Sequence, residues 1–436
     1  MLTENTIEKL RILAESAKYD VSCSSSGTVR SGKKGMVGNT VGGVGICHSF
    51  ADDGRCISLL KVMLTNYCMY DCAYCINRRS NDIKRATLSV SELEEIVMEF
   101  YRRNYIEGLF LSSGVVRNPD YTMERLVAIA RDLRTIHRFN GYIHLKSIPG
   151  ASRELVQEAG RWADRMSVNI EIPKEESLKL LAPEKDHKSV FEPMKFIREG
   201  VLENKEDRKH LKHVPRFVPA GQSTQMIVGA TAETDQDILS LSSALYGTPT
   251  MRRVYYSGYV SVNTYDSRLP ILKQPPLVRE NRLYQADWLM RFYGFSVNEI
   301  VDNEHANLDL DVDPKVSWAL RHPECFPVDI NKAEYEMILR VPGIGVKSAT
   351  LIVNSRRFNR LTSYHLKKMG VVMKKAKYFI TCGELTDFYS NKIIGINELH
   401  PERLKPLLLS KSQLKKKSQE QQLKLDFNDE DTPNLP

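Results

Sequence analysis

Three cysteines near the start of the chain have a spacing that could hold an iron–sulfur cluster. Cys68, Cys72 and Cys75 are separated by three and then by two residues, in the segment Cys-Met-Tyr-Asp-Cys-Ala-Tyr-Cys. Because a cubic 4Fe–4S cluster normally takes four thiolates, three cysteines so close together predict either a distant fourth ligand or one iron that is open to a substrate or cofactor. We therefore predict that these cysteines bind one 4Fe–4S cluster and form the catalytic centre.

Zinc and disulfides are the alternatives for a cysteine-rich segment. Zinc sites more often show two separated Cys-x2-Cys pairs, or pairs of Cys and His. A disulfide framework is not expected in a chain of 436 residues with eight cysteines, and residues 1–9 lack the apolar core of a signal peptide. Cys325 and Cys382 have no metal-type spacing, so we expect each to be a small buried hydrophobe.

Three further cysteines precede this segment. Cys23, Cys47 and Cys56 have long, irregular spacing, and His48 follows the second of them. Three thiolates and an imidazole can satisfy zinc or contribute to an auxiliary cluster. The sequence leaves open whether these residues form a second metal centre or are unliganded structural cysteines.

The segment from Cys68 to Cys75 resembles the radical S-adenosylmethionine (SAM) superfamily, in which the amino and carboxylate groups of SAM chelate the open iron. Tyr74 matches the aromatic residue that this family carries before its third cysteine, beside the adenine. The resemblance implies a 4Fe–4S cluster and SAM as cofactors, and a cellular one-electron donor as a partner. It also implies that the reduced cluster cleaves SAM to methionine and a 5′-deoxyadenosyl radical.

Short apolar strands alternate with amphipathic helices over much of the chain. The patterns predict helices at residues 89–105 and 123–137, and strands at residues 57–64, 108–111, 142–146, 166–170, 226–228 and 254–256. Such alternation is typical of a parallel sheet with helices outside it. We predict an α/β fold, a partial (β/α)6 TIM-like barrel, which the family resemblance also implies, joined to a small all-α helix-hairpin-helix domain.

Composition, patterning and the family resemblances together predict four regions. Residues 1–50 begin with a helix and continue into a Gly- and Ser-rich segment, residues 51–290 form the radical SAM core, residues 291–390 form a helical DNA-binding module, and residues 391–436 form a basic, disordered tail. No apolar run reaches the length of a membrane span, and an oxygen-sensitive cluster needs a reducing environment. We therefore expect a cytoplasmic protein.

Several loops at predicted strand ends match positions where the family binds SAM. The resemblance assigns Ser112, Ser113 and Gly114 to the methionine amino group, although the family typically has a Gly-Gly-Glu type segment there. It assigns Glu171 a polar contact to the ribose or methionine moiety, and Gly229 to the turn near the adenine. An ordinary strand cap or turn is the alternative at each position, but active sites of such barrels collect at the strand C-termini.

Three tyrosines lie at or just after the last predicted strand. Tyr255, Tyr256 and Tyr259 are candidates for substrate stacking or radical relay at the mouth of the barrel. Core packing is the alternative role for at least some of them.

The formal net charge of +8 is concentrated in the last quarter of the chain. Residues 331–420 hold 18 Lys or Arg and 7 Asp or Glu, a net charge of +11, whereas residues 1–330 hold 43 of each sign. Scattered charge usually means a solvated surface, but segregation of this kind indicates a module that binds a polyanion.

A glycine-containing hairpin is predicted within this basic region. Asn331 and Glu334 have the spacing of a capping box, so a helix should begin there, end near residues 341–345 and be followed by a second helix. The segment Val-Pro-Gly-Ile-Gly-Val-Lys-Ser-Ala resembles the helix-hairpin-helix motif of DNA repair proteins. Glycines let backbone N–H groups converge at a helix N-terminus, which is a ready site for a phosphate. We predict DNA binding, dependent on salt more than on base sequence, by Gly343, Gly345, Lys347 and Ser348.

Similar hairpins occur in base-excision glycosylases, in which a Lys in the hairpin and an Asp in a later turn carry catalysis. Lys347 has a comparable position, but residues 361–366 contain no carboxylate. We therefore assign Lys347 to phosphate binding and not to glycosylase chemistry.

The tail contains one short motif. The segment from Gln422 to Phe427, Gln-Leu-Lys-Leu-Asp-Phe, resembles the motif by which bacterial repair proteins dock on the sliding clamp. Short motifs arise easily by chance, so an inert solvated tail is the alternative.

Over nearly its whole length the chain resembles radical SAM proteins assigned to DNA modification or repair. This resemblance predicts an enzyme that uses the radical to modify or repair a nucleic acid, with DNA as the first choice. A base in duplex DNA would have to be flipped out, at a cost of roughly a few kcal/mol. Two alternatives remain open: a radical SAM enzyme that acts on RNA, and a non-catalytic iron–sulfur protein that binds nucleic acid.

Overall fold

The computed structural model describes residues 2–19, 46–50, 56–382 and 401–409. These residues form two compact units. The first unit comprises Met1–Glu233 and Leu241–Glu280, and the second comprises Thr234–Ser240 and Asn281–Pro436. Cys23 and the segment from Gln422 to Phe427 lie outside the described residues, so the sliding-clamp motif stays a prediction.

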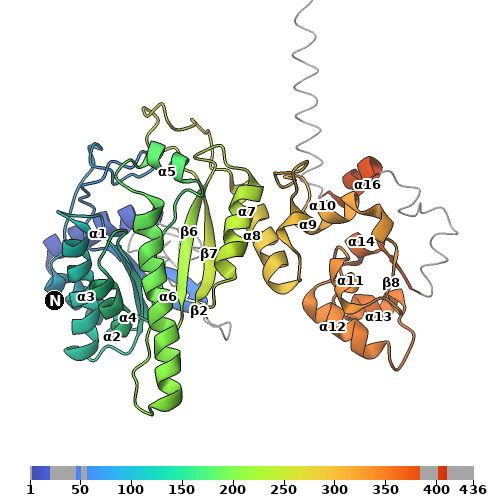
Figure 1. Cartoon of the computed structure of the whole chain (residues 1–436), viewed down its shortest axis with the longest axis horizontal. Coiled ribbons are helices and arrows are strands. Elements are labelled where there is room, and N and C mark those ends of the chain that lie inside the picture. The colour runs from blue at the N-terminus through green and yellow to red at the C-terminus, as the bar shows by residue number, and fades with distance from the viewer. Residues whose placement is uncertain (1, 20–45, 51–55, 383–400, 410–436) are drawn as a thin grey trace, which may run out of the picture. The chain divides into compact units, whose positions relative to one another are not determined.

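A seven-stranded sheet forms the centre of the first unit (Figure 1). Its strands lie in chain order: β1 (Ile46–Phe50), β2 (Cys56–Met63), β3 (Gly108–Ser112), β4 (Tyr142–Lys146), β5 (Arg165–Ser167), β6 (Gln222–Val228) and β7 (Met251–Gly258). β1 is antiparallel to β2, and each later neighbour is parallel to the one before it. The sheet is curled, with helices between successive parallel strands, which confirms the predicted α/β fold and its partial barrel.

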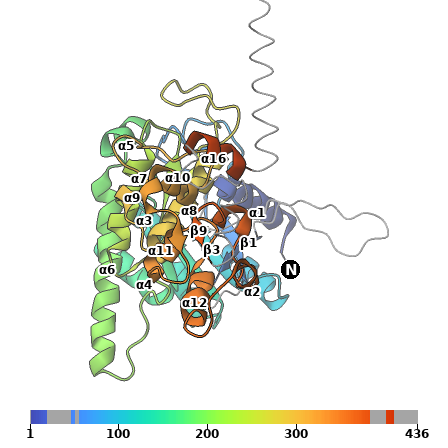
Figure 2. The same ribbon diagram turned by 90° about the vertical axis from the view of Figure 1, so that its right-hand side faces the viewer.

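Helices precede, connect and follow these strands along the chain. They are α1 (Glu4–Ser16), followed by a 3-10 turn (Ala17–Tyr19), α2 (Val90–Arg102), α3 (Pro119–Thr135), α4 (Arg153–Trp162), α5 (Glu175–Leu181), α6 (His187–His210), α7 (Asp235–Tyr246) and α8 (Leu277–Phe292). α7 and α8 contribute residues to both units. Helices α2, α3, α4 and α6 pack side by side in that order, and α6 extends past its neighbours in both views (Figure 1, Figure 2). No helix in the described ranges is both long and apolar enough to cross a membrane.

Local sequence explains where α2 begins. The Ser89 Oγ accepts a hydrogen bond from the Glu92 N–H at 3.1 Å, and the Glu92 carboxylate accepts one from the Ser89 N–H at 2.7 Å. This reciprocal pair satisfies two backbone donors that the first helical turn leaves open. The helix therefore starts where the sequence predicts.

The inner strands are apolar, and one of them is shorter than predicted. All five residues of β3 are buried, because helices and neighbouring chain cover both of its faces. A strand was expected over residues 166–170, but β5 ends at Ser167, and the chain pairs with β6 again only at Glu171, opposite Met226. Glu171 itself has a φ of +64°, a left-handed conformation, so this renewed pairing does not continue as a regular strand.

The second unit is mainly helical. Its elements are α9 (Val297–Ile300), α10 (Pro314–Arg321), a 3-10 turn (Pro323–Cys325), β8 (Val328–Asp329), α11 (Tyr335–Arg340), α12 (Val346–Ser355), α13 (Ser363–Lys368), α14 (Met373–Ala376), β9 (Ile380–Thr381) and α16 (Pro401–Leu408). The prediction of an all-α domain is wrong in one respect, because β8 and β9 form a short parallel pair. In that pair the Val328 N–H donates to the Phe379 carbonyl at 2.9 Å.

The predicted capping box at Asn331 is also wrong. α11 begins later, at Tyr335, and its N-cap residue Glu334 makes no side-chain cap hydrogen bond. Asn331 instead uses both ends of its amide on Leu361, accepting from the N–H at 2.8 Å and donating to the carbonyl at 3.2 Å. The Asn331 side chain therefore binds the backbone of Leu361, which is distant in sequence, and does not cap the start of a helix.

Candidate functional site

The three predicted ligand cysteines lie on the loop that follows β2, at the C-terminal edge of the sheet. Cys72 is 5% exposed and packs in an apolar cluster with Ile172 and Tyr259. Cys68 and Cys75 are partly exposed. The Cys75 N–H donates to the Cys72 carbonyl at 3.0 Å and closes a turn between the second and third cysteine.

The electrostatics of these thiols suit a shared cluster. Burial raises the pKa of the Cys72 thiol and raises that of Cys75 to about 12, and neighbouring cysteine sulfurs add to both shifts. The Cys68 Sγ accepts a hydrogen bond from the Val115 N–H at 3.4 Å. Buried thiolates that repel one another need positive charge, which iron supplies. The residues present therefore fit a 4Fe–4S cluster.

Lys185 places a positive charge beside these sulfurs, and no motif in the sequence indicated it. Lys185 lies in the loop that joins α5 to α6, and its side chain is partly buried. Its Nζ lies 5.9 Å from the centroid of the Tyr74 ring. Burial lowers the pKa of this ammonium, but Cys72, Tyr74 and Glu171 outweigh burial and hold the pKa well above its ordinary value. The buried Tyr74 hydroxyl has no hydrogen-bond partner among the described residues, which leaves it for a bound group.

The predicted SAM-binding segment after β3 lies against the cysteine loop. A side chain at Gly114 would place its Cβ 2.2 Å from the Tyr67 carbonyl oxygen, so glycine is required for the two loops to approach. The Ser113 hydroxyl donates to the Gly114 carbonyl at 2.7 Å, and Ser112 is 3% exposed. The structure brings this segment next to Cys68, with Gly114 as the residue in close approach.

Glu171 and Gly229, predicted near the ends of β5 and β6, also lie around the cysteine loop. The Glu171 carboxylate raises the pKa of the Cys72 thiol further, after burial and Cys68. Gly229 ends β6 with a φ of +87°, and the next residue, Ala230, packs in the same cluster as Cys72. The ends of β2, β3, β5 and β6 therefore meet at one edge of the sheet, where barrel enzymes place their active sites.

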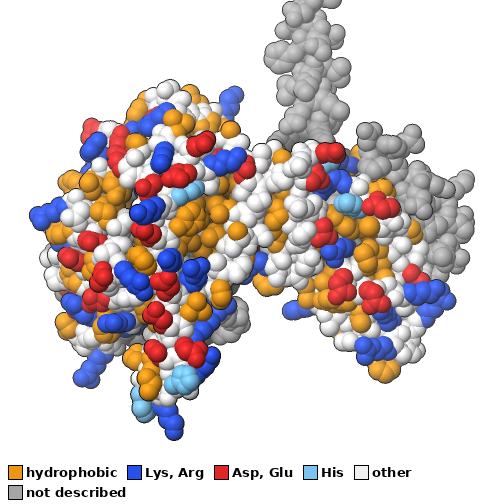
Figure 3. Space-filling view, in the orientation of Figure 1, with side chains coloured by type: hydrophobic (Ala, Val, Ile, Leu, Met, Phe, Trp, Pro, Cys, Tyr) orange, Lys and Arg blue, Asp and Glu red, His pale blue; other side chains and the backbone are white. Residues whose placement is uncertain are grey.

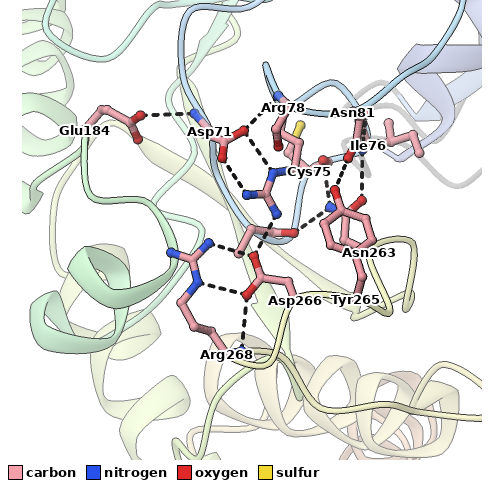
Figure 4. Close-up of polar contacts among 12 residues, drawn as sticks. Asp71, Cys75, Ile76, Arg78, Asn81, Glu184, Asn263, Tyr265, Asp266 and Arg268 are labelled. Atoms are coloured by element: carbon pink, nitrogen blue, oxygen red, sulfur yellow. Dashed lines mark hydrogen bonds and ion pairs between the residues drawn. The ribbon is translucent and has the colours of Figure 1, made fainter.

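A buried ion-pair network ties the cysteine loop to the segment after β7 (Figure 4). The Arg78 guanidinium donates to both carboxylate oxygens of Asp71, at 3.0 and 2.5 Å, and to Asp266 at 2.7 Å. Arg268 donates to both oxygens of Asp266, at 2.9 and 2.6 Å. Arg78 lowers the pKa of the Asp71 carboxyl, and Arg268 together with Arg78 lowers that of Asp266. All these groups therefore stay charged.

Asn263 extends this network to the cysteine backbone (Figure 4). Its Nδ2 donates to the carbonyls of Ala73 and Cys75, at 2.6 and 3.0 Å, and its Oδ1 accepts from Asn81 at 2.9 Å. The contact with Ala73 joins residues 190 positions apart. We call the four central residues the clasp: Asp71, Arg78, Asn263 and Asp266. Single polar residues in loops have no periodicity, so no sequence signal indicated them.

The three candidate tyrosines have different surroundings in the structure. Tyr256 is fully buried, and its hydroxyl donates to the Ser242 Oγ at 2.9 Å, so it is a core residue and not a stacking surface. Tyr255 is partly buried, with the Arg253 guanidinium 5.8 Å from its ring centroid. Tyr259 alone of the three belongs to the apolar cluster around Cys72.

Residues 62–242 match the family model of the radical SAM superfamily. The chain contains a radical SAM domain. The cofactors of this domain are a 4Fe–4S cluster and SAM, as predicted from the three cysteines and the family resemblance. No curated protein matches the chain.

Solved structures similar to the chain include three enzymes. The FeFe-hydrogenase maturase HydG from Carboxydothermus hydrogenoformans is 13% identical, with 52% of this chain and 50% of that chain covered and a TM-score of 0.39. Methylornithine synthase (PylB) is 13% identical, with 75% and 83% covered and a TM-score of 0.39. Coproporphyrinogen III oxidase (HemN) from Escherichia coli is 13% identical, with 59% and 56% covered and a TM-score of 0.31. The match to HydG spans half of that chain.

Two of the three cysteines of the predicted second metal centre lie in the first two strands of the first unit, Cys47 in β1 and Cys56 in β2. Cys47 is buried in an apolar cluster with Leu59 and Phe110. In the β1–β2 pair Cys47 lies opposite Leu59 and Cys56 lies opposite Phe50, so the two cysteines are not partners in register. Within the described ranges, no three His, Cys, Asp or Glu side chains gather around one metal-ion position. A second metal centre stays a prediction.

The predicted glycine hairpin connects α11 and α12 in the second unit. α11 ends at Arg340, and α12 begins at Val346 with Gly345 as its N-cap. Gly343 has a φ of +88°, and a Cβ there would lie 2.7 Å from the Val372 carbonyl oxygen, so glycine is required. Two helices joined by a glycine turn are therefore present, and their role in DNA binding stays a prediction.

The turn is held from within the second unit by a buried lysine. The Lys315 Nζ donates to the Ile344 carbonyl at 2.6 Å. The Tyr293 hydroxyl also lies close to the turn, 3.5 Å from the position that a Cβ at Gly345 would take.

The two side chains predicted to bind DNA after the glycines differ in exposure. Lys347 is exposed. Ser348 is 7% exposed, and its hydroxyl donates to the Met369 carbonyl at 2.8 Å. The Ser348 hydroxyl therefore holds the fold, and DNA binding by Ser348, which would use its backbone N–H, stays a prediction.

The charge around this hairpin is one-sided. Between Glu336 and Glu384 the sequence has ten Lys or Arg and no Asp or Glu. Arg340 pairs with Glu299 at 2.7 Å, and Lys375 pairs with Asp313 at 2.6 Å. Six others are exposed and have no carboxylate within ion-pair distance in the described part of the chain: Lys347, Arg357, Arg360, Lys367, Lys368 and Lys374. Figure 3 shows Lys and Arg side chains gathered at the end of this unit that carries α12 and α13.

Proposed function

We propose that this chain is a radical SAM enzyme that modifies or repairs DNA. The observation that carries the proposal is the pairing, in one chain, of a radical SAM domain with a fixed glycine hairpin that is surrounded by unpaired cations. Exposed cations without carboxylate partners favour a polyanionic substrate. The helix-hairpin-helix resemblance favours DNA as that polyanion.

The residues of the first unit have separate tasks in this proposal. Cys68, Cys72 and Cys75 would hold the cluster, and Lys185 would offset the negative charge of their sulfurs. The clasp would keep the cysteine loop in one conformation, and the apolar packing around Cys72 would exclude water. When bound, the cluster and SAM supply a 5′-deoxyadenosyl radical.

The second unit would bind the substrate. Lys347 is exposed at the start of α12, where the amides of the first helical turn have no partner within the helix. These groups would bind backbone phosphates and would therefore position DNA without reading its sequence. A target base in duplex DNA would have to leave the stack, and the phosphate contacts would stabilise that complex.

Isotope transfer tests the proposal. The full chain, with its cluster reconstituted anaerobically and reduced, is mixed with SAM and deuterium-labelled DNA or RNA. We expect 5′-deoxyadenosine to form and to carry deuterium from the DNA. Transfer from RNA alone would overturn the choice of DNA, and the absence of SAM cleavage by a fully loaded cluster would overturn the enzymatic function.

A further inference from the structure

A phenylalanine stands exposed among the unpaired cations of the second unit. Phe358 follows α12 and is 84% exposed. Its neighbours Arg357 and Arg360 are exposed too. A lone exposed apolar side chain needs no explanation by itself, so the turn that carries it decides whether it has a function.

The turn that carries Phe358 is fixed at both ends. On one side Arg356 donates to the carbonyls of Ala333 and Ile330, at 2.5 and 3.2 Å. On the other side the backbone of Leu361 makes the two hydrogen bonds with the Asn331 amide described above. The chain between these anchors presents its aromatic ring to solvent on a well-supported turn.

A second exposed aromatic ring follows within a few residues. Tyr364 lies in the first turn of α13 and is 59% exposed. The Lys368 Nζ, one helical turn later, lies 4.7 Å from the Tyr364 ring centroid, within cation–π range. The next residue back, Lys367, is exposed as well. Each of the two rings thus has cations beside it, and Figure 3 shows hydrophobic side chains exposed between Lys and Arg at this end of the unit.

We infer that Phe358 and Tyr364 stack on unpaired bases of a nucleic acid strand whose phosphates are held by the neighbouring Arg and Lys side chains. Flat rings beside a basic surface are the arrangement by which proteins bind single strands, because every base has a face on which a ring can stack. An acidic peptide would satisfy the cations through its carboxylates, but a nucleic acid strand supplies both a phosphate for a cation and a base for a ring at every nucleotide. The inference rests on the proposed nucleic acid substrate, and it adds that the strand is unpaired where it meets this surface.

Binding of fluorescent oligonucleotides to the full, cluster-loaded chain tests the inference. Three probes of one length are compared: a single strand, an intact duplex, and a duplex with one bulged base. The wild-type chain should bind the single strand and the bulged duplex more tightly than the intact duplex. Phe358→Ala should weaken binding of the first two by about 5- to 150-fold and leave binding of the intact duplex unchanged.

Two matched substitutions separate stacking from apolar contact. Phe358→Trp keeps an aromatic face and should retain the affinity, whereas Phe358→Leu keeps apolar bulk without that face and should bind as weakly as Phe358→Ala. Ile136→Ala, which removes another exposed apolar side chain, 68% exposed and in the first unit, should change nothing. SAM cleavage without nucleic acid should be equal in all variants, which confirms an intact radical SAM domain.

The outcomes distinguish this inference from the function on which it rests. If the wild-type chain binds none of the probes, the nucleic acid substrate itself is wrong. If it binds all three equally and Phe358→Ala has no effect, the substrate stands and only the stacking surface is wrong. Equal losses on the intact duplex and the single strand would also overturn it, because a base inside a paired stack offers no face to Phe358.

Discussion

Two buried cations, one in each unit, are treated in opposite ways. Arg78 is 6% exposed and Lys315 is 7% exposed. Arg78 binds two carboxylates, Asp71 first and then Asp266, and they raise its pKa above the ordinary value. Lys315 donates to the neutral carbonyl of Ile344. Burial lowers its pKa to about 7, and the cations Arg340 and Lys375 add to this shift while Asp313 opposes it.

The same contrast holds for the surroundings of each cation. The clasp satisfies the charges around the cysteine loop inside the fold, so they act on the loop and on nothing outside it. In the second unit Asp313, which acts on the charge of Lys315, pairs with Lys375, while six exposed cations lack carboxylates in the described ranges. The clasp charges of the first unit are therefore neutralised inside the fold, whereas the six cations of the second unit stay available to a ligand of the kind we propose.

The largest effect is expected from the loop that the clasp holds. Cys72→Ala removes a buried thiolate from the ligand set, so iron and sulfide bound per chain should fall to background and SAM cleavage should be lost. Iron analysis and product chromatography measure both. Cys325→Ala, at a cysteine outside this loop, is the matched control and should keep both values. A full iron load in Cys72→Ala would show that Cys72 is not a cluster ligand. The clasp would then not be holding a ligand loop in place.

Removal of the clasp arginine should have the next largest effect. Arg78→Ala leaves Asp71 and Asp266 without their shared cation, which should destabilise the first unit by about 3–5 kcal/mol. Faster hydrogen–deuterium exchange of peptides that cover residues 68–81 measures this loss. Lys179→Ala breaks an exposed pair with Glu175 and should cost only about 0.3–0.5 kcal/mol. Equal exchange in the two variants would show that the buried network does not hold the loop.

Because Lys315 is buried without a carboxylate partner among the described residues, the stability of the second unit should depend on pH, with the opposite sign from that expected for a paired cation. The pKa of Lys315 is about 7 in the fold and 10.5 in the ordinary state, so between these values the unfolded chain binds one more proton than the folded one. The stability of the second unit should therefore rise as the pH rises from 7 to 10.5. Lys315→Met should flatten this rise, as followed by urea unfolding at several pH values. Lys347→Met, at an exposed lysine, should leave it, and an unchanged slope in Lys315→Met would place the effect elsewhere.

The comparison also shows which parts of the molecule a sequence can predict. β3 and β4 were predictable because a run of apolar residues is a local pattern. The radical SAM domain was predictable because the spacing of Cys68, Cys72 and Cys75 is local too. The clasp was not, because Asn263 and Ala73 are 190 positions apart and meet through single polar atoms. The cap at Asn331 was predicted wrongly for a related reason: its local pattern cannot show that Leu361 competes for the same amide.

The smallest effect is expected on the affinity for DNA, when an unpaired lysine and a paired lysine of the second unit are each substituted. Lys347 is exposed without a carboxylate partner, whereas Lys375 donates to Asp313 at 2.6 Å. Lys347→Ala should weaken DNA binding severalfold and reduce the slope of log affinity against log salt by about 0.9, because one phosphate contact is lost. Lys375→Ala should leave that slope unchanged, since its charge is already used. Anisotropy titrations at several salt concentrations measure both slopes, and equal changes would mean that internal pairing does not decide which cations bind the substrate.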